Sequence, residues 1–360
     1  KEKLMRIGAL QPGVPIVDYH IEDPEQALVK MEEGLDLLAE HVRQAGREGC
    51  DAVALTEDTP GLHKWLAVFG EKYPEGLPRG GEMMLGKLGE AAANQNMYLV
   101  CCSDSIGEDG AVYNTSFFVG RDGKEIGRYL KANMPYSELG GRSRGPGYPV
   151  FETPDLGGVG MLICYDMVFP EPIRCLGLGG ADIVFVPTMG AAAMADGELS
   201  RTAFRVRAVD NFVYMVVAFR GGGSMVISPK GDILAEGGGP LVCADVDPFG
   251  GREGGNAYDW QRDMRARLFR ERAPETYDIL TAPEPPALTK LPTEDTPEEV
   301  TRRANGVMTV GADGFDKAQE LMDQGKKEEA IQAFGKLRED FPTSWIDRVA
   351  QERLKEIRGE

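Results

Sequence analysis

The stretch GGVGMLICYDMVFPEP, residues 157–172, contains an apolar run that ends directly before a cysteine. Residues 159–163 have the composition of a short buried strand, Cys164 follows them, and Pro170-Glu171 is typical of a helix start. Taken alone, a cysteine after an apolar strand is most often a small core residue. Where a strand ends and a helix begins, however, backbone N–H groups are free to bind an oxyanion. The stretch therefore supports two interpretations of Cys164, a core thiol and a nucleophile.

Short strand patterns alternate with helical patterns on both sides of this stretch. The pair Asp23-Pro24 is typical of a helix N-cap followed by the first helical residue. Residues 112–119 and 125–130, joined by the turn RDGK, predict a β-hairpin. Further strands are expected at 4–10, 52–55, 98–102, 159–163, 182–186, 213–218, 224–227 and 233–235, and further helices near 82–93, from 170 and near 199–211. The mixture of βα units and hairpins predicts a layered α/β domain rather than a purely parallel sheet.

The last part of the chain has a different composition. Residues 282–300 are rich in Pro, Glu and Thr, which is typical of a linker. Beyond it, apolar residues recur at helical spacing in 315–322, again in 330–337 after Gly325, and in a third helix over 345–357. We therefore expect three parts: an α/β domain over residues 1–281, a linker over 282–310 and an all-α segment over 311–360.

Residues 314–342, GFDKAQELMDQGKKEEAIQAFGKLREDFP, resemble one tetratricopeptide repeat. One such unit cannot bury its own apolar face, and about three are usual for a stable array. We expect it to dock on the main domain, on another subunit or on a protein partner. A capping helical hairpin with only a structural role is the alternative.

The composition excludes several classes of protein. The net charge of −18 argues against nucleic acid and anionic membranes as partners, and no apolar run is long enough to span a membrane. The cysteines are too sparse for a disulfide scaffold, and neither a CxxC pair nor a Cys/His cluster with metal-ligand spacing is present. All three histidines, His20, His41 and His63, lie in the first 63 residues. We therefore expect no metal site built from histidine and cysteine.

The start of the chain bears on its location. No signal peptide is visible at the N-terminus, so we expect a cytoplasmic protein. The chain begins at Lys1 rather than Met, which leaves open a leader removed before this residue.

The residues from Cys164 onward carry a specific resemblance. Residues 164–188, CYDMVFPEPIRCLGLGGADIVFVPT, resemble the nucleophile segment of the nitrilase superfamily, the carbon–nitrogen hydrolases. That pattern has Cys-Tyr-Asp, then Phe-Pro-Glu, an Arg, and Gly-Ala-Asp before a strand that ends in Pro. The family uses a Glu–Lys–Cys triad, so a glutamate and a lysine must precede Cys164 in that order.

Both residues are present in matching segments. CDAVALTE, residues 50–57, ends in Glu57, where the family more often has Phe-Pro-Glu; the adjacent Asp58 is an alternative. GRYLK, residues 127–131, ends in Lys131, but the usual Lys-x-His is Lys-Ala-Asn here, so the histidine is replaced by Asn133. Glu138 matches a second family glutamate in a Pro-containing loop. With further matches at 113–116, 207–211 and 223–231, the resemblance covers about residues 4–248.

The resemblance implies a mechanism. Cys164 is the nucleophile of a thioester pathway, and Glu57 is the general base, with a pKa that burial would need to raise. Lys131 and the backbone N–H of Tyr165 would hold the oxyanion, and Glu138 would position substrate or water and help keep Lys131 charged. A reactive Cys164 with a low pKa would be alkylated faster than the other five thiols.

The resemblance also implies a fold and a substrate class. The expected fold is a four-layer αββα sandwich that forms a homodimer or larger homo-oligomer, with the helix after Cys164 at the interface and with neither a metal nor a cofactor. Tyr165-Asp166 resembles amidase-type members, which favours hydrolysis of a small-molecule amide over a nitrile. An N-carbamoyl substrate is an alternative; Met167 and Val168 stand where such hydrolases carry an Arg pair, although Arg142 or Arg144 could bind a carboxylate. A non-catalytic scaffold that acts through the helical tail is a further alternative.

Overall fold

Two six-stranded β-sheets form the centre of the molecule. The structure, a computed structural model, describes residues 4–13, 17, 21, 23–63, 65, 73–189, 197–220, 222–250, 268–291, 296–301, 311–341 and 345–359. The first sheet has the order β12-β1-β2-β3-β4-β5, formed by Leu241–Val246, Met5–Leu10, Ala52–Ala54, Tyr98–Ile106, Val112–Val119 and Glu125–Leu130. The second has the order β11-β10-β9-β8-β7-β6, formed by Ile233–Gly237, Ser224–Ile227, Tyr214–Phe219, Ile183–Thr188, Gly157–Met161 and Val150–Thr153.

Both sheets mix strand directions, as the alternation of βα units and hairpins predicts. Strands β1, β2 and β3 pair in parallel, as do β7, β8 and β9. The remaining neighbouring pairs are antiparallel, including the predicted hairpin of β4 and β5.

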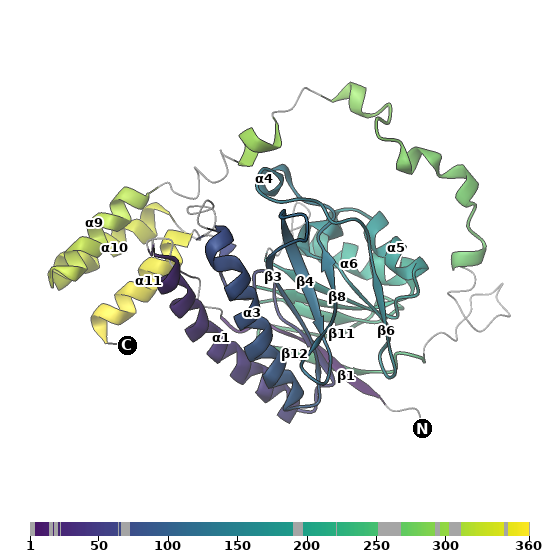
Figure 1. The fold of residues 1–360 in the computed structure, drawn as a ribbon, viewed down its shortest axis with the longest axis horizontal. Helices are drawn as coiled ribbons and strands as arrows, with labels where there is room; N and C mark the ends of the chain where they lie inside the picture. Colours follow the sequence, from purple (N-terminus) through teal and green to yellow (C-terminus); the bar gives the residue numbers. More distant parts are fainter. Residues whose placement is uncertain are drawn as a thin grey trace.

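The two sheets stack face to face and helices cover their outer faces (Figure 1). Side chains that alternate along each strand point to opposite faces of the first sheet. Val100 and Phe118 join the core between the sheets, whereas their neighbours Leu99 and Phe117 pack against helices α1 (Pro24–Arg47) and α3 (Tyr73–Ala93). Helices α5 (Glu171–Leu178) and α6 (Gly197–Asn211) cover the second sheet. The expected four-layer αββα sandwich is therefore confirmed.

Helix α1 shows how local sequence sets these elements. Asp23 is its N-cap and accepts a hydrogen bond from the backbone N of Glu25 at 3.1 Å, with Pro24 as the first helical residue. One face of the helix is buried, from Ala27 to Ala45 at helical spacing. The helix predicted from the Asp23-Pro24 pair is confirmed.

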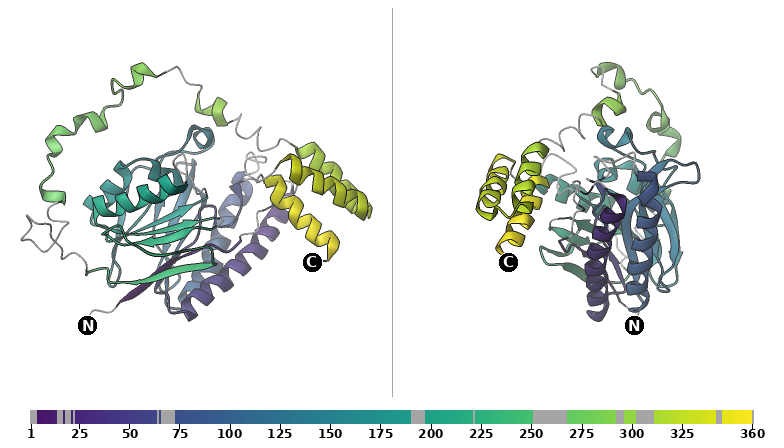
Figure 2. Two further views of the ribbon diagram at one scale, coloured as in Figure 1. Left: turned by 180° about the vertical axis from the view of Figure 1, so that it is seen from behind. Right: turned by 60° about the vertical axis from the view of Figure 1, so that its left-hand side comes forward.

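The C-terminal part forms three helices, as predicted. These are α9 (Ala312–Asp323), α10 (Lys327–Asp340) and α11 (Trp345–Arg358), and they lie together beyond the linker (Figure 2). They share a core of their own, in which the rings of Phe315 and Phe334 meet edge to face with centroids 5.3 Å apart. Helix α11 adds Ile346, Val349 and Ala350 to this core. Helix α11 therefore covers much of the apolar face of α9 and α10, for which the sequence predicted a docking partner.

The described part of the linker differs from both packed regions. It contains one short 3₁₀ helix, η5 (Leu288–Lys290), and two more, η3 (Pro274–Thr276) and η4 (Asp278–Thr281), lie at the end of the predicted α/β domain just before it. Ile279 and Leu280 of η4 and Leu288 of η5 are at least half exposed. Residues 282–291, where the composition predicts a linker, thus contribute little to the core of either packed region.

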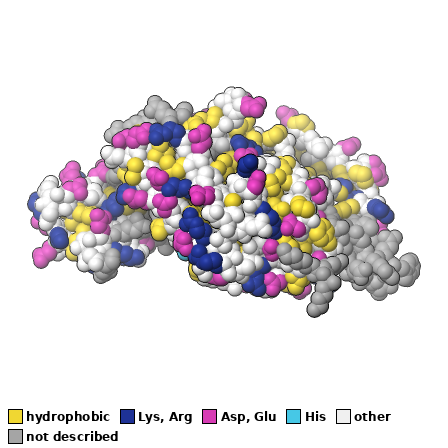
Figure 3. Space-filling view, turned by 60° about the horizontal axis from the view of Figure 1, so that its bottom comes forward, with side chains coloured by type: hydrophobic (Ala, Val, Ile, Leu, Met, Phe, Trp, Pro, Cys, Tyr) yellow, Lys and Arg dark blue, Asp and Glu magenta, His cyan; other side chains and the backbone are white. Residues whose placement is uncertain are grey.

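Charged side chains of both signs are mixed over the face shown in Figure 3, with apolar side chains between them. Within the described helices, none has both the length and the apolar composition that crossing a bilayer requires.

Candidate active site

The predicted site residues come from the ends of strands in both sheets. Glu57 follows β2 and Lys131 directly follows β5, both in the first sheet. Cys164 follows β7 of the second sheet and begins the 3₁₀ helix η2 (Cys164–Val168). Glu138 lies on the short helix α4 (Tyr136–Leu139), just after Lys131. The stacking of the sheets brings these distant segments together.

Lys131 is the centre of this cluster. Its side chain is 0% exposed, and its Nζ donates to Glu57 Oε1 at 3.0 Å and to Glu138 Oε2 at 2.9 Å. Burial lowers the pKa of Lys131, but the carboxylates of Glu57 and Glu138 outweigh it and hold this pKa well above its ordinary value. Lys131 is therefore a fixed cation at neutral pH.

Glu57 is buried and fully hydrogen-bonded. Besides Lys131, Asn114 Nδ2 donates to its Oε1 at 2.9 Å, and the backbone N of Met189 donates to its Oε2 at 3.1 Å. Burial raises the pKa of Glu57, but Lys131 and His63 oppose it and lower this pKa to about 2. The raised pKa predicted for Glu57 is thus wrong in direction, because Glu57 is buried next to the Lys131 cation.

Cys164 has an unusual backbone. Its φ is 43°, in the left-handed region that non-glycine residues rarely adopt. Burial and the Glu57 carboxylate raise the pKa of the Cys164 thiol to about 11, against the opposing effects of Lys131, Thr188 and the Met189 N–H. The low pKa predicted for a reactive Cys164 is therefore also wrong in direction. At neutral pH the proton lies on sulfur and the negative charge lies on Glu57.

Asp166 holds this turn in place. Its carboxylate is fully buried; Oδ2 accepts from the backbone N of Ile163 at 2.9 Å and from the Tyr129 hydroxyl at 2.7 Å. Its Oδ1 accepts from the backbone N of Asn133 at 2.9 Å. Asp166 thus ties the residue before Cys164 to the segments on either side of Lys131.

Asn133, which stands where the family pattern has histidine, belongs to the same network. Its Nδ2 donates to the Tyr148 hydroxyl at 2.9 Å and to Asp166 Oδ1 at 3.2 Å. Asn133 therefore links the lysine loop to the cysteine turn through its side chain.

Arg142 and Arg144 bind groups of the protein itself. Arg142 makes two 2.7 Å hydrogen bonds to the carboxylate of Asp104, whose side chain is 0% exposed. Arg144 donates to the backbone O of Ala132 at 3.1 Å. The guanidinium suggested as a carboxylate-binding group at Arg142 is therefore already engaged by a buried anion.

The sequence did not indicate a role for several residues around Glu57. His63 Nε2 lies 3.4 Å from Asp104 Oδ2; burial lowers the pKa of His63, but Asp58 and Asp104 outweigh it and raise this pKa. Arg220 donates to the backbone O of Glu57 at 3.0 Å. The signal in the sequence for a buried polar contact near Glu57 was a polar residue within a strand, such as Asn114 in β4.

Among the described residues, no group of three or more His, Cys, Asp or Glu side chains is arranged to hold a metal ion. The cluster of Glu57, Lys131, Glu138 and Cys164 brings together two carboxylates, an ammonium group and a thiol.

The chain is similar to proteins of a known family. The sequence profile of the carbon-nitrogen hydrolase family matches residues 23–240. The chain belongs to this family. The deaminated glutathione amidase of Synechocystis sp. is 32% identical over 164 residues, which are 39% of this chain and 60% of that protein. The omega-amidase NIT2 of Homo sapiens is 30% identical over 230 residues, covering 57% of this chain and 80% of that protein.

A solved structure supports the fold of this carbon–nitrogen hydrolase. An amidase from Nesterenkonia sp. superimposes with a TM-score of 0.55 at 22% identity, covering 69% of this chain and 92% of that one. That amidase has also been solved with the acetamide moiety of fluoroacetamide added covalently at its active-site cysteine. The C-terminal helices of the present chain lie beyond the residues that the family profile matches.

Proposed function

We propose that this chain hydrolyses the C–N bond of small amides through a thioester on Cys164. The observation that carries the proposal is the buried Lys131 ammonium, held between the carboxylates of Glu57 and Glu138 beside the Cys164 thiol. Acyl transfer to sulfur requires a thiol, a base that takes its proton and a cation that stabilises the oxyanion. Cys164, Glu57 and Lys131 have these properties and lie close together. The similar proteins of Synechocystis sp. and Homo sapiens are both named as amidases.

The proposed first half-reaction forms the thioester. Cys164 Sγ attacks the amide carbonyl carbon, an S–C bond forms, the C=O π pair moves to oxygen, and Glu57 takes the thiol proton. Lys131 and the Tyr165 backbone N–H hold the oxyanion, each donor contributing about 3–4 kcal/mol to the transition state. The first amides of a helix lack an intrahelical acceptor, and Tyr165 is the second residue of η2. The C–N bond then breaks, and Glu57 returns the proton to the leaving ammonia or amine.

The second half-reaction consumes water. Glu57 takes a proton from a water molecule that attacks the thioester carbonyl, the S–C bond breaks, and the proton returns to sulfur. Glu138 orients the water or substrate and shares the charge of Lys131, to which it is bonded at 2.9 Å. The products are a carboxylic acid and the regenerated Cys164 thiol.

Two of the cations near the site, Arg142 and Lys131, do not favour a substrate that carries a carboxylate, such as an N-carbamoyl amino acid. The guanidinium of Arg142 is paired with the buried Asp104, and Lys131 is shared by two carboxylates. Neither cation is therefore available to bind a substrate carboxylate without breaking an existing ion pair.

The test is release of ammonia or amine by the full chain from aliphatic and aromatic amides, N-carbamoyl amino acids and nitriles. We expect turnover of amides, an acyl adduct on Cys164 by intact mass, and loss of both in Cys164→Ala. Cys175→Ala is the matched control, because it removes an exposed thiol and should retain full activity. Turnover by Cys164→Ala would contradict the proposal.

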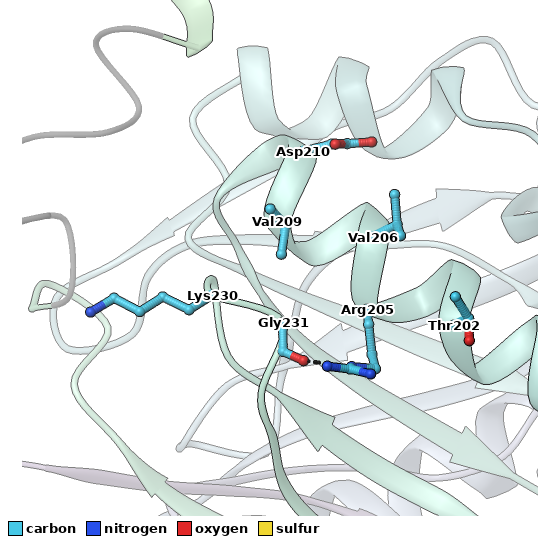
Figure 4. Close-up of a pocket in the computed structure, with 7 residues that line it drawn as sticks. All are labelled: Thr202, Arg205, Val206, Val209, Asp210, Lys230 and Gly231. Carbon is cyan, nitrogen blue, oxygen red and sulfur yellow. Dashed lines mark hydrogen bonds between the residues drawn. The ribbon is translucent and has the colours of Figure 1, made fainter. Parts of the chain in front are cut away.

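We also propose that the chain forms a homo-oligomer through the outer faces of α5 and α6. Leu178 of α5 and Val206 and Val209 of α6 are each more than 40% exposed. Beside them, α6 and the turn at Lys230-Gly231 line a surface cavity of about 440 Å³ (Figure 4). Val206→Glu should lower the oligomer mass in sedimentation, whereas Val29→Glu, on the exposed face of α1, should not. An unchanged mass for Val206→Glu would exclude this face.

The domain organisation stays our proposal: a hydrolase domain over residues 1–281, a linker over 282–310 and a tetratricopeptide-like segment over 311–360. Its support is the separate core of α9, α10 and α11.

A further inference from the structure

The helix that carries Glu138 is too short to fix itself. Helix α4 spans only Tyr136–Leu139, and none of its side chains is buried. An isolated helical turn is unstable, because one hydrogen bond does not repay the conformational entropy of the residues that it orders. Yet Glu138 Oε2 must lie 2.9 Å from Lys131 Nζ for the ion pair to form. Contacts from outside the turn must therefore hold it.

Residues 296–301 supply such a contact. Residues 297–301 are helical and lie next to α4, within the linker (Figure 1). The Thr301 hydroxyl donates to the backbone O of Tyr136 at 2.8 Å and accepts from the backbone N of Gly140 at 3.0 Å. These two backbone groups are four residues apart, the spacing of a helical hydrogen bond. One side chain thus bridges the two ends of the turn that bears Glu138.

The approach between the two segments is close. A Cβ added to Gly140 would lie 2.5 Å from Thr301 Oγ1 and 2.7 Å from Thr301 Cβ. The φ of Gly140 is −68°, which any residue can adopt, so the close approach rather than the backbone conformation requires glycine here.

The bridging segment is ordered by its own sequence. Thr296 and Glu299 form a reciprocal capping box: Glu299 Oε2 accepts from the Thr296 N at 3.1 Å, and Thr296 Oγ1 accepts from the Glu299 N at 3.3 Å. Pro297 occupies the first helical position, which its fixed φ favours. Thr301 therefore lies on a short turn whose start is capped by its own side chains.

We propose that Thr301 is a positioning residue for Glu138, so that the segment between the hydrolase domain and the C-terminal helices sets the geometry of the active site. The proposal rests on the proposed role of Glu138 in amide hydrolysis. Thr301 touches neither substrate nor the reacting atoms. It acts by holding α4, and it lies outside residues 23–240 that match the family profile.

The test uses full-length Thr301→Val, which keeps the shape of the side chain and removes both hydrogen bonds. We expect kcat on the best amide to fall about tenfold, with a smaller change in KM and an unchanged melting temperature, because a small misplacement of a catalytic group costs rate. Thr301→Ser, which keeps the hydroxyl, should restore the rate. Gly140→Ala should reproduce the loss by pushing the segment away. Thr289→Val, elsewhere in the linker, is the matched control and should leave kcat unchanged.

A double-variant cycle decides whether Thr301 acts through Glu138. In a Glu138→Gln background, Thr301→Val should cause little further loss of kcat. A full additional tenfold loss there, or an unchanged kcat in Thr301→Val, would overturn the proposal.

Amide hydrogen exchange separates this proposal from the proposed reaction. The Gly140 N–H should exchange at least several-fold faster in Thr301→Val than in the wild type or Thr301→Ser, whether or not any amide is turned over. Equal exchange in all three proteins would refute the bridge itself. Faster exchange in a protein that hydrolyses no amide would instead refute the proposed reaction and leave the bridge standing.

Discussion

Replacing Lys131 with methionine should destabilise the fold strongly, because it removes a cation and leaves a buried anion behind. Methionine keeps the length and much of the volume of the lysine side chain. Glu57, whose side chain is only 3% exposed, would keep two hydrogen-bond donors, Asn114 Nδ2 and the Met189 N–H, but lose the ammonium at 3.0 Å. Glu138 would lose the same partner, but it is 25% exposed and water can solvate it.

Breaking a buried ion pair by removing one partner costs about 3–5 kcal/mol. The pKa of Glu57, about 2 instead of its ordinary 4.5, has the matching sign, because Lys131 lowers this pKa against the effect of burial. Because the native pKa is depressed, this stabilisation is present above pH 4.5 and is lost as the pH falls toward 2. We therefore expect Lys131→Met to lose about 3–5 kcal/mol at pH 8.

The sign of the pH dependence should reverse in the variant. Without the cation, burial raises the pKa of Glu57 above its value in the unfolded chain, so protonation stabilises the native state. The penalty measured against wild type should then shrink between pH 8 and pH 5. Adding Glu57→Gln to Lys131→Met removes the stranded charge and should recover at least half of the loss at pH 8.

Urea unfolding followed by far-UV circular dichroism, at one fixed protein concentration, measures these differences. A Lys131→Met protein that unfolds at the wild-type urea concentration would refute the reasoning. So would a penalty that is the same at both pH values and is not relieved by Glu57→Gln. Neither readout depends on catalysis.

Three further predictions follow from single features of the structure. The rate of Cys164 alkylation by iodoacetamide, followed by mass spectrometry, should rise about tenfold per pH unit from pH 7 without levelling below pH 10, because the pKa of the thiol is about 11; a plateau near pH 7 would show a preformed thiolate. Asp166→Asn should lower kcat about 100-fold with little change in KM, since both carboxylate oxygens accept from N–H or O–H donors and the amide nitrogen that replaces one of them cannot accept; an unaffected kcat would contradict the role of this turn. Gly127→Ala should lower the free energy of unfolding by about 1–3 kcal/mol, because the added Cβ would lie 2.1 Å from the Phe151 ring, whereas Gly86→Ala in α3, with open space around it, should not destabilise.

The strand and helix pattern was largely predictable because it depends on local signals. The hairpin of β4 and β5 follows from alternating residues around the RDGK turn, and α1 follows from its Asp23-Pro24 start. Strand β12 was not predicted. It pairs antiparallel with β1, Met5 opposite Val246, across almost the whole hydrolase domain. No local sequence pattern indicates which distant strand will pair with an open sheet edge. The pairing of β12 with β1 is therefore known only from the tertiary structure.

The identity of the four main site residues was predicted through the family resemblance, and the structure brings Glu57, Lys131 and Glu138 into direct contact. Their protonation was not predicted. Burial alone raises the pKa of a carboxyl group, whereas a buried cation lowers it, and the sequence does not state the distance between the two groups. The same holds for Cys164, where an anion and a cation act in opposite directions on one thiol.

These protonation states have a consequence for the proposed mechanism. With the pKa of Cys164 at about 11 and that of Glu57 at about 2, the free site holds a thiol and a weak base. Lys131 is what weakens that base, because its charge stabilises the Glu57 carboxylate at 3.0 Å. When the substrate carbonyl oxygen begins to carry negative charge, Lys131 stabilises that oxyanion as well as Glu57. The stabilisation of the Glu57 carboxylate by Lys131 is then weaker, so the pKa of Glu57 rises toward the value that burial favours. Glu57 thus becomes a stronger base as the sulfur attacks, so the buried cation that keeps Glu57 a weak base in the free protein also permits proton transfer in the transition state.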